Sequence, residues 1–233
     1  MLRKLTQRAA LAAALLLPLF SLAAAPPQAY HLELEATPEA AFPYLGRFGA
    51  VDLHVYAGGV RGEALWLHGF SRNGAKTLTV ANPLGRMYVD VQTNEIRSIL
   101  TKMRGASGNE PLERPALAPP MRGKVKGIDA TRHRLLYGPE AWIDIWTTDV
   151  IPPNAQFRML VSQAVSGIAP GTAAVANQLP GTPIYVELNF RRFKKLPIIK
   201  LKKLTFSADD QEDALTLGSF YVRAGVLEKI FAK

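Results

Sequence analysis

Apolar and polar residues alternate with a period of two through much of this chain, which predicts a protein built mainly of β-strands. Residues 30–36 are the first example, with Tyr30, Leu32 and Leu34 on one side and polar residues on the other, as in a half-buried strand. Short runs of a similar kind follow, separated by glycine and asparagine turns that are typical of an antiparallel meander. These runs are 51–56, 63–68, 76–81 and 86–91.

The second half of the chain predicts further strands with short helices between them. A hairpin is expected from 128–137 and 141–147, because a Gly-Pro turn separates two strongly apolar runs. Apolar residues spaced three and four apart predict helices capped by Thr93 and by Asn154. The remaining expected elements are helical segments beginning at 37 and spanning 172–177 and 227–231, and strands at 184–193, 198–207 and 214–222.

Together these elements predict an α+β fold. We expect one large curved antiparallel sheet, in the form of a half-barrel, covered on one face by short helices and a long loop. The loop is 105–120, where four prolines argue against a packed element, so we expect a mobile loop or lid.

Residues 1–25 have the pattern of an export signal, with three basic residues, an apolar stretch at 9–22 and small residues at 23–25. The apolar stretch is short for a membrane span, although an uncleaved N-terminal anchor is the alternative. Residues 26–233 are expected to form a single domain. No cysteine follows the apolar stretch, so we expect a periplasmic or secreted protein without a lipid anchor.

The charge of the chain favours anionic partners without defining one. Its formal net charge is +9, and the three basic residues of the signal account for part of it. Such an excess favours anionic surfaces, including lipid head groups, but does not single out nucleic acid, and we expect a monomer that binds none. The absence of cysteine excludes thiol redox chemistry and cysteine-ligated metal.

The chain from Lys126 onward resembles the LolA-like superfamily of bacterial lipoprotein carriers and lipid-binding proteins. The resemblance rests on the segments 127–130, 140–146, 181–185 and 219–222, in this order and spacing. It implies an incomplete β-barrel wrapped over helices, with an apolar cavity between sheet and helices that accommodates acyl chains.

The first half of the chain departs from that pattern. A strand at 30–36 precedes the expected helix at Thr37, whereas the carrier proteins usually begin with a helix. Strand followed by helix is similar to the opening of START-like helix-grip domains, which also form an apolar pocket. Those domains usually end in a long helix, and this chain does not, so the START-like family is the second choice.

Two groups of residues are candidates for binding. Aromatic residues on the expected central strands are candidates for lining a cavity: Trp66, Tyr88, Trp142, Trp146, Tyr185 and Phe190. A basic run is a candidate for contact with an anionic membrane surface, or for protecting an exposed strand edge: Arg191, Arg192, Lys194, Lys195, Lys200, Lys202 and Lys203.

No residue is assigned a catalytic role. His68-Gly69-Phe70-Ser71 is similar to the His-Gly segment of α/β-hydrolases, but no later serine lies on a Gly-x-Ser-x-Gly turn. The four histidines lack metal-ligand spacing, so we expect no metal or cofactor and histidines at the surface.

We therefore expect a non-enzymatic binding or carrier protein of the cell envelope, whose ligand is a lipid or another hydrophobic molecule. The alternative is an envelope protein-interaction module with a packed core, which uses its basic face or a strand edge. An exported hydrolase is the third hypothesis.

Overall fold

The structure is a computed structural model, and it describes residues 29–36, 49–64, 66–103, 114–168, 171–191, 195–207 and 212–225. Several sequence predictions lie outside these residues: the export signal, the helix start at 37–39, residues 105–113 of the long loop and the helix at 227–231. None of the helices in the described part of the chain has the length and apolar character needed to cross a membrane.

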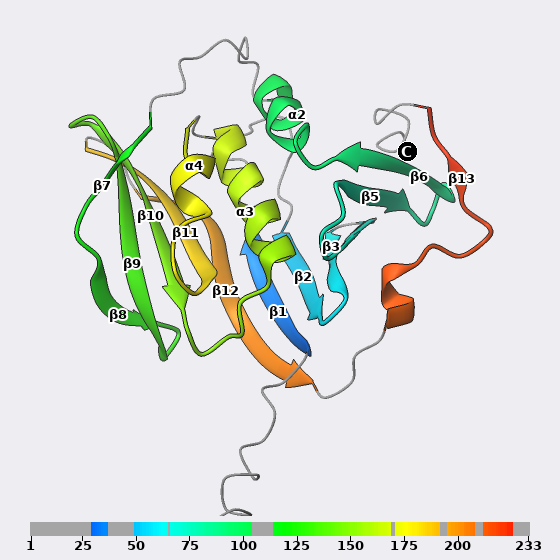
Figure 1. Cartoon of the computed structure of the whole chain (residues 1–233), viewed down its shortest axis with the longest axis horizontal. Coiled ribbons are helices and arrows are strands. Elements are labelled where there is room, and N and C mark those ends of the chain that lie inside the picture. The colour runs from blue at the N-terminus through cyan, green and yellow to red at the C-terminus, as the bar shows by residue number, and fades with distance from the viewer. Residues whose placement is uncertain are drawn as a thin grey trace, which may run out of the picture.

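One sheet of thirteen strands dominates the described residues (Figure 1). Its order is β13-β6-β5-β4-β3-β2-β1-β12-β11-β10-β9-β7, and β8 also pairs with β9. All neighbours are antiparallel except β13, which runs parallel to β6. The strands are β1 (Ala29–Ala36), β2 (Gly49–Tyr56), β3 (Gly59–Ala64), β4 (Leu67–Arg72), β5 (Thr77–Asn82), β6 (Met87–Gln92), β7 (Ala116–Leu117), β8 (Met121–Val125), β9 (Ile128–Tyr137), β10 (Ala141–Thr148), β11 (Thr182–Phe190), β12 (Leu196–Ser207) and β13 (Val222–Arg223).

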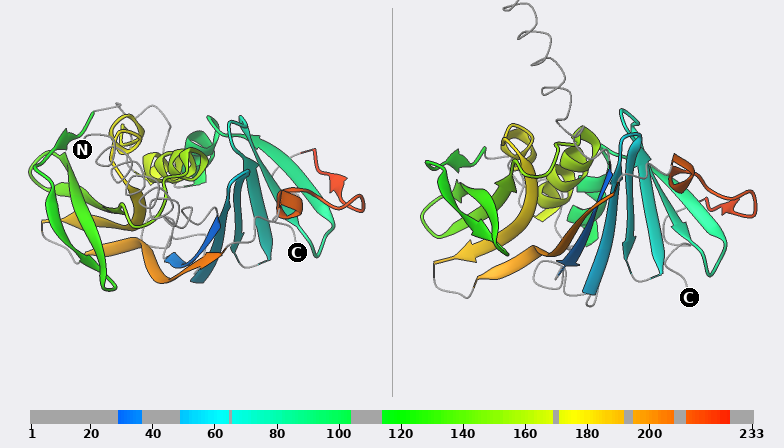
Figure 2. Two further views of the ribbon diagram at one scale, coloured as in Figure 1. Left: turned by 60° about the horizontal axis from the view of Figure 1, so that its bottom comes forward. Right: turned by 90° about the horizontal axis from the view of Figure 1, so that it is seen from below.

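Helices cover one face of this sheet, which we call the inner face; the opposite face is the outer face (Figure 2). These helices are α2 (Ile96–Met103), α3 (Ala155–Ile168) and α4 (Ala173–Ala176). The 3-10 helix η3 (Glu212–Leu215) lies on the outer face, where Leu215 packs with Ala29 and Tyr56. Helix α3 begins where predicted, because the Asn154 side chain accepts a hydrogen bond from the backbone N–H of Phe157 at 2.9 Å. Helix α2 packs on α3 at Gly167, where a Cβ atom would lie only 2.5 Å from Leu100 Cβ.

The main core lies between α3 and the inner face of the sheet. Phe157 packs with buried residues of β1 and β2 such as Leu32, and Val165 packs with buried residues of β9, β10 and β11 such as Ile143. Val161 contacts both groups. A single helix therefore joins the two halves of the sheet.

Strand β12 contains a β-bulge opposite β1. Glu33 pairs with Lys203 and Leu34 pairs with Leu201, so Lys202 is an extra residue on β12. Leu201 is buried in the core, whereas the Lys202 and Lys203 ammonium groups form ion pairs with glutamates on the outer face of β1.

The sequence prediction of an α+β fold dominated by a large antiparallel sheet is confirmed, and the sheet is open rather than closed. The hairpin at 128–137 and 141–147 and the helix after Asn154 are confirmed in place. Part of the long loop, 114–120, contains the short strand β7.

Two predicted strands are wrong. The run 63–68 joins the end of β3 to the start of β4, because the chain turns after Ala64 inside an apolar stretch that has no glycine or proline to mark it. The run 214–222 forms η3 and a loop before β13, because Leu215 turns onto the sheet and is buried with Ala29 and Tyr56.

The prediction that the histidines lie at the surface is wrong for His133. His133 is only 4% exposed, and its Nε2 atom lies 3.0 Å from the Thr147 hydroxyl. Burial lowers the pKa of His133, because the charged imidazolium loses its hydration, and the charge of Asp149 opposes this in part.

Acidification should therefore destabilise the fold through His133. The unfolded chain binds a proton near pH 6.5 and the folded chain only at lower pH, so stability is complete above that value and falls below it, by up to about 1.4 kcal/mol per pH unit. Urea unfolding at pH 7.5, 6.5 and 5.5 measures this loss, which should be smaller in His133→Gln. An identical pH dependence in the two proteins would contradict this assignment.

Candidate functional site

The described side chains beneath α3 and α4 pack closely against the sheet. Beneath α3 and α4 the side chains of Ile145, Val161, Val165 and Leu179 leave a void of about 10 Å³, room for a single water molecule at most. An acyl chain does not fit there. The apolar cavity implied by the resemblance to lipoprotein carriers is therefore not formed by these residues.

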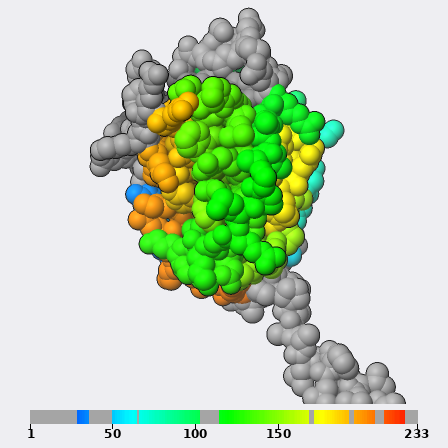
Figure 3. Space-filling view, turned by 90° about the vertical axis from the view of Figure 1, so that its left-hand side faces the viewer, coloured from blue at the N-terminus to red at the C-terminus, as the bar shows by residue number. Residues whose placement is uncertain are grey.

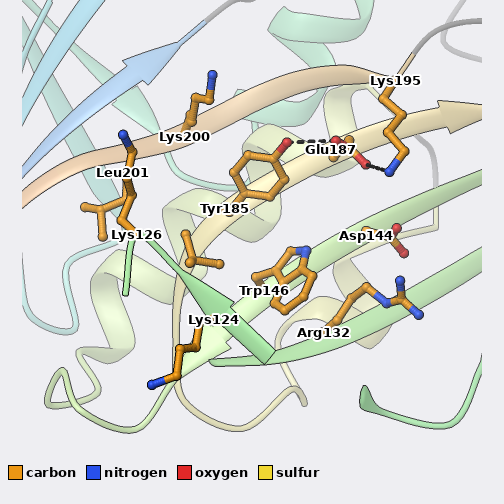
Figure 4. A pocket seen from close by; sticks show the side chains of 11 residues that line it. Lys124, Lys126, Arg132, Asp144, Trp146, Tyr185, Glu187, Lys195, Lys200 and Leu201 are labelled. Carbon is orange, nitrogen blue, oxygen red and sulfur yellow. Dashed lines mark hydrogen bonds and ion pairs between the residues drawn. The ribbon is translucent and has the colours of Figure 1, made fainter. Parts of the chain in front are cut away.

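A larger hollow, of about 340 Å³, lies on the outer face. Side chains alternate along each strand, so while Ile145 and Val186 enter the core on the inner face, the residues beside them point the other way. We call this hollow the outer groove (Figure 4). Its lining residues are Lys124, Val125, Lys126, Arg132, Asp144, Trp146, Tyr185, Glu187, Lys195, Lys200 and Leu201.

Two rows of cross-strand neighbours form the floor of the outer groove. The first row crosses four strands, and each residue is the direct partner of the next: Arg132 on β9, Trp146 on β10, Tyr185 on β11 and Lys200 on β12. The second row is Arg134, Asp144 and Glu187 on β9, β10 and β11. The first row therefore places two aromatic rings between two cations, and the second places two carboxylates side by side.

Each of these two carboxylates has its own partners. Asp144, whose side chain is 4% exposed, accepts two hydrogen bonds of 2.8 Å from the guanidinium of Arg134. Glu187 accepts a 2.7 Å hydrogen bond from the Tyr185 hydroxyl and lies 3.9 Å from Lys195 Nζ. Burial, this hydrogen bond and the charge of Glu187 all raise the pKa of Tyr185, so the phenol stays protonated and remains a donor.

The β8–β9 hairpin forms one wall of the outer groove. Its two-residue turn has positive φ at Lys126 (52°) and at Gly127 (82°), as in a type I′ hairpin. On β8, Gly123 packs directly on the Trp146 ring, since a Cβ atom there would lie 2.8 Å from Cζ3. The hairpin strands form the surface at this end of the molecule, with β12 beside them (Figure 3).

Cations outnumber anions around the outer groove. Lys124 is paired with Asp129 at 2.9 Å, and Lys195 with Glu187. In the described part of the chain, Lys126, Arg132 and Lys200 have no carboxylate within 4.0 Å; Arg132 donates to the sulfur of Met121 instead. The groove therefore presents uncompensated positive charge to an incoming molecule.

The structure brings two of the six predicted aromatic residues together, Trp146 and Tyr185. Trp142 lies on the same strand as Trp146, and the guanidinium carbon of Arg134 is 4.9 Å from its ring centroid. The other three are elsewhere: Trp66 packs beside Leu67, Tyr88 is on β6 opposite Ala81, and Phe190 is on β11 opposite Ala141.

The predicted basic run divides into groove residues and paired residues. Lys195 and Lys200 line the outer groove. Lys202 pairs with Glu35 at 2.5 Å, Lys203 with Glu33 at 3.4 Å and Arg191 with Glu140 at 3.4 Å. Arg192 and Lys194 lie outside the described residues.

Sequence reasoning missed the cations of the β8–β9 hairpin, namely Lys124, Lys126 and Arg132. The signal that would have found the turn is Lys126-Gly127 between two alternating segments. That the hairpin folds over the outer face depends on Gly123 and Trp146, which are far apart in the sequence.

His68-Gly69-Phe70-Ser71 forms part of β4. Ser71 is 2% exposed; its hydroxyl donates to the carbonyl of Thr77 at 2.6 Å and accepts from the Gln156 amide. His68 lies beside Arg61 and Glu63. Residues three apart on a strand face opposite sides, so His68 and Ser71 do not approach each other.

No group of three or more His, Asp or Glu side chains within the described ranges is arranged to hold a metal ion. The largest concentration of imidazoles is on the outer face, where the His31 and His54 rings stack at 4.2 Å. Asp52 lies 3.2 Å from His31 Nε2.

The chain matches no protein-family model and no curated protein sequence. Among solved structures it is similar to an uncharacterised conserved protein from Thermus thermophilus, with a TM-score of 0.46 and 8% identity over 85% of this chain and 91% of that one. Likeness at this level carries no argument about function, which leaves the geometry of the groove as the guide.

Gly123→Ala should destabilise the protein and disturb Trp146, because the added methyl overlaps the indole ring. We expect a loss of about 1–3 kcal/mol in the free energy of unfolding, together with a changed near-ultraviolet circular dichroism signal. The matched control is Gly62→Ala, where the new Cβ meets Leu53 at an ordinary 3.5 Å. Equal effects of the two substitutions would contradict the packing described here.

Arg134→Leu should cost about 2–4 kcal/mol of stability, because it leaves the buried Asp144 carboxylate without its cation. Lys124→Leu is the control: it breaks a pair whose side chains are 66% and 79% exposed and should cost less than about 1 kcal/mol. Urea unfolding at pH 7 measures both. An effect of Arg134→Leu no larger than that of Lys124→Leu would contradict the dependence of buried Asp144 on its cation.

Proposed function

We propose that the protein is a non-enzymatic binding or carrier protein of the cell envelope that holds a hydrophobic ligand, such as the acyl chain of a lipid, in the outer groove. The observation that carries the proposal is the row of Trp146 and Tyr185 on the floor of a hollow of about 340 Å³. Ligand pockets typically have volumes of about 300–1,000 Å³, and this hollow falls in that range, with apolar contact supplied by Val125, Trp146, Tyr185 and Leu201 among charged side chains.

The site is thus proposed on a different face from the one that the LolA-like resemblance implies. In this proposal, the curved strands β8–β12 act as a half-barrel whose hollow faces away from α3. Burial of each methylene contributes about 0.8 kcal/mol, so about six of them in the groove would contribute about 5 kcal/mol. Chain length would then govern affinity more than any single polar contact.

Export to the periplasm and contact with an anionic membrane surface belong to the same proposal. The basic residues of β12, together with Arg191, Arg192, Lys194 and Lys195, would supply that contact. Lys202 and Lys203 already form ion pairs with Glu35 and Glu33. The lysines of the groove should therefore attract anions more strongly than these two do.

The second candidate is an envelope protein-interaction module. The observation that favours it is the filled space beneath α3 and α4, with its void of only about 10 Å³. Under this alternative the outer groove would receive part of a partner protein, and no lipid would copurify. The hydrolase hypothesis is not supported by the arrangement of β4.

Tryptophan fluorescence tests the proposed site. A long-chain alcohol or fatty acid should change the Trp146 fluorescence of the unaltered protein in a saturable way. Binding measured by calorimetry should be about tenfold or more weaker in Trp146→Ala, because the substitution removes a large apolar surface from the floor. Trp66→Phe, which alters a ring that packs beside Leu67, is the control and should bind normally.

Native mass spectrometry of the purified protein provides the independent readout. Copurifying acyl species that are absent from Trp146→Ala would support the proposal. Absence of saturable binding by any acyl compound would overturn it and leave the interaction module.

A further inference from the structure

We propose that Lys126 and Lys200 form a two-lysine clamp that binds an oxyanion, the carboxylate or phosphate head of the ligand, at one end of the outer groove. This inference rests on the proposed function and adds the head-group class. It makes the ligand an amphipathic anion, with its chain on the aromatic floor and its head between two ammonium groups.

The two lysines come to the groove from different sides. Lys126 is at the tip of the β8–β9 hairpin, and Lys200 follows Tyr185 in the first row of the floor. Both line the same hollow (Figure 4). An anion bound there would therefore be held by the hairpin wall and by β12 together.

Glu35, a neighbouring carboxylate on β1, is affected by the charges of both Lys126 and Lys200. The pKa of Glu35 is lowered, first by the hydrogen bond from Lys202 and then by the charges of Lys202, Lys200 and Lys126. The Glu35 carboxylate itself is bound by Lys202 at 2.5 Å. Lys126 and Lys200 thus lie in one electrostatic neighbourhood, beside a carboxylate that is held by a third lysine.

The outer face matches its other lysines with carboxylates. Lys124, Lys195, Lys202 and Lys203 each have an acidic partner within 4.0 Å. Among the described residues Lys126 and Lys200 have none at that distance, yet both line the groove. The carboxylate beside them, Glu35, is held by Lys202, which leaves the two ammonium groups available to an external anion.

The backbone supplies a separate argument for Lys126. Its φ of 52° is in the left-handed region, where the first turn position of a type I′ hairpin favours Asn, Asp or Gly. Turn geometry therefore does not account for a lysine here. A binding role for the charge at the tip of the groove wall does account for the lysine, because strained backbone positions cluster at binding sites.

The test compares three ligands on the full protein by calorimetry: dodecanoate, dodecan-1-ol and acetate, with inorganic phosphate as a competitor. Dodecanoate has chain and charged head, dodecan-1-ol has the chain alone, and acetate has the head alone. We expect dodecanoate to bind about fivefold more tightly than dodecan-1-ol, and this preference to shrink at high salt.

The double variant Lys126→Asn, Lys200→Gln should lose that preference while still binding dodecan-1-ol. Asn suits the turn at least as well as Lys, so a folding defect is not expected to confuse the result. Lys203→Gln is the matched control, because it removes a β12 lysine that pairs with Glu33 and does not line the groove.

The outcomes separate the two proposals. Equal affinity for dodecanoate and dodecan-1-ol in the unaltered protein, or a preference that survives in the double variant, would overturn the clamp but leave hydrophobic binding intact. Binding of acetate or phosphate that vanishes in the double variant, without any binding of dodecan-1-ol, would retain the clamp as a site for a free oxyanion and overturn the proposed function. No binding of any of these ligands would overturn both.

Discussion

The packing of α3 on the inner face of the sheet is the interaction on which the rest of the structure depends. Phe157, Val161 and Val165 occupy successive turns of this helix and contact both halves of the core. These side chains fill the space beneath α3, where the described residues leave a void of only about 10 Å³. The larger hollow of the outer groove is formed by side chains that point away from α3.

On the outer face, charged side chains keep a wide sheet surface hydrated, and many of them are paired with a charge of opposite sign. Cross-strand neighbours of opposite sign do this in several places, such as Arg134 with Asp144 and Lys203 with Glu33. The outer groove interrupts this matching, since aromatic rings replace charges at Trp146 and Tyr185, and cations nearby are left in excess. A departure from local rules of this kind is expected at a functional site.

The sequence predicted the fold class and many of the elements, because period-two alternation and turn residues are local signals. It failed at 63–68, where a tight turn has no turn residue, and at 214–222, where burial of Leu215 against Tyr56 overrides strand propensity. It named Trp146 and Tyr185 together with Lys195 and Lys200, but not the hairpin lysines. The position of Gly123 over Trp146 is a tertiary contact between separate strands, and no local pattern records it.

The bulge at Lys202 has a further consequence for how β12 is encoded. Before it, Lys200 faces outward and Leu201 inward; after it, Lys203 faces outward and Leu204 lies opposite Leu32 and against the core. This one extra residue shifts the alternation of β12. The adjacent Lys202 and Lys203 therefore face the same side, and Leu201 and Leu204, before and after the bulge, both face the core. Removing that single residue would bring Leu201 and Lys203 next to each other in regular alternation, so the bulge would disappear while Leu204 kept its place opposite Leu32.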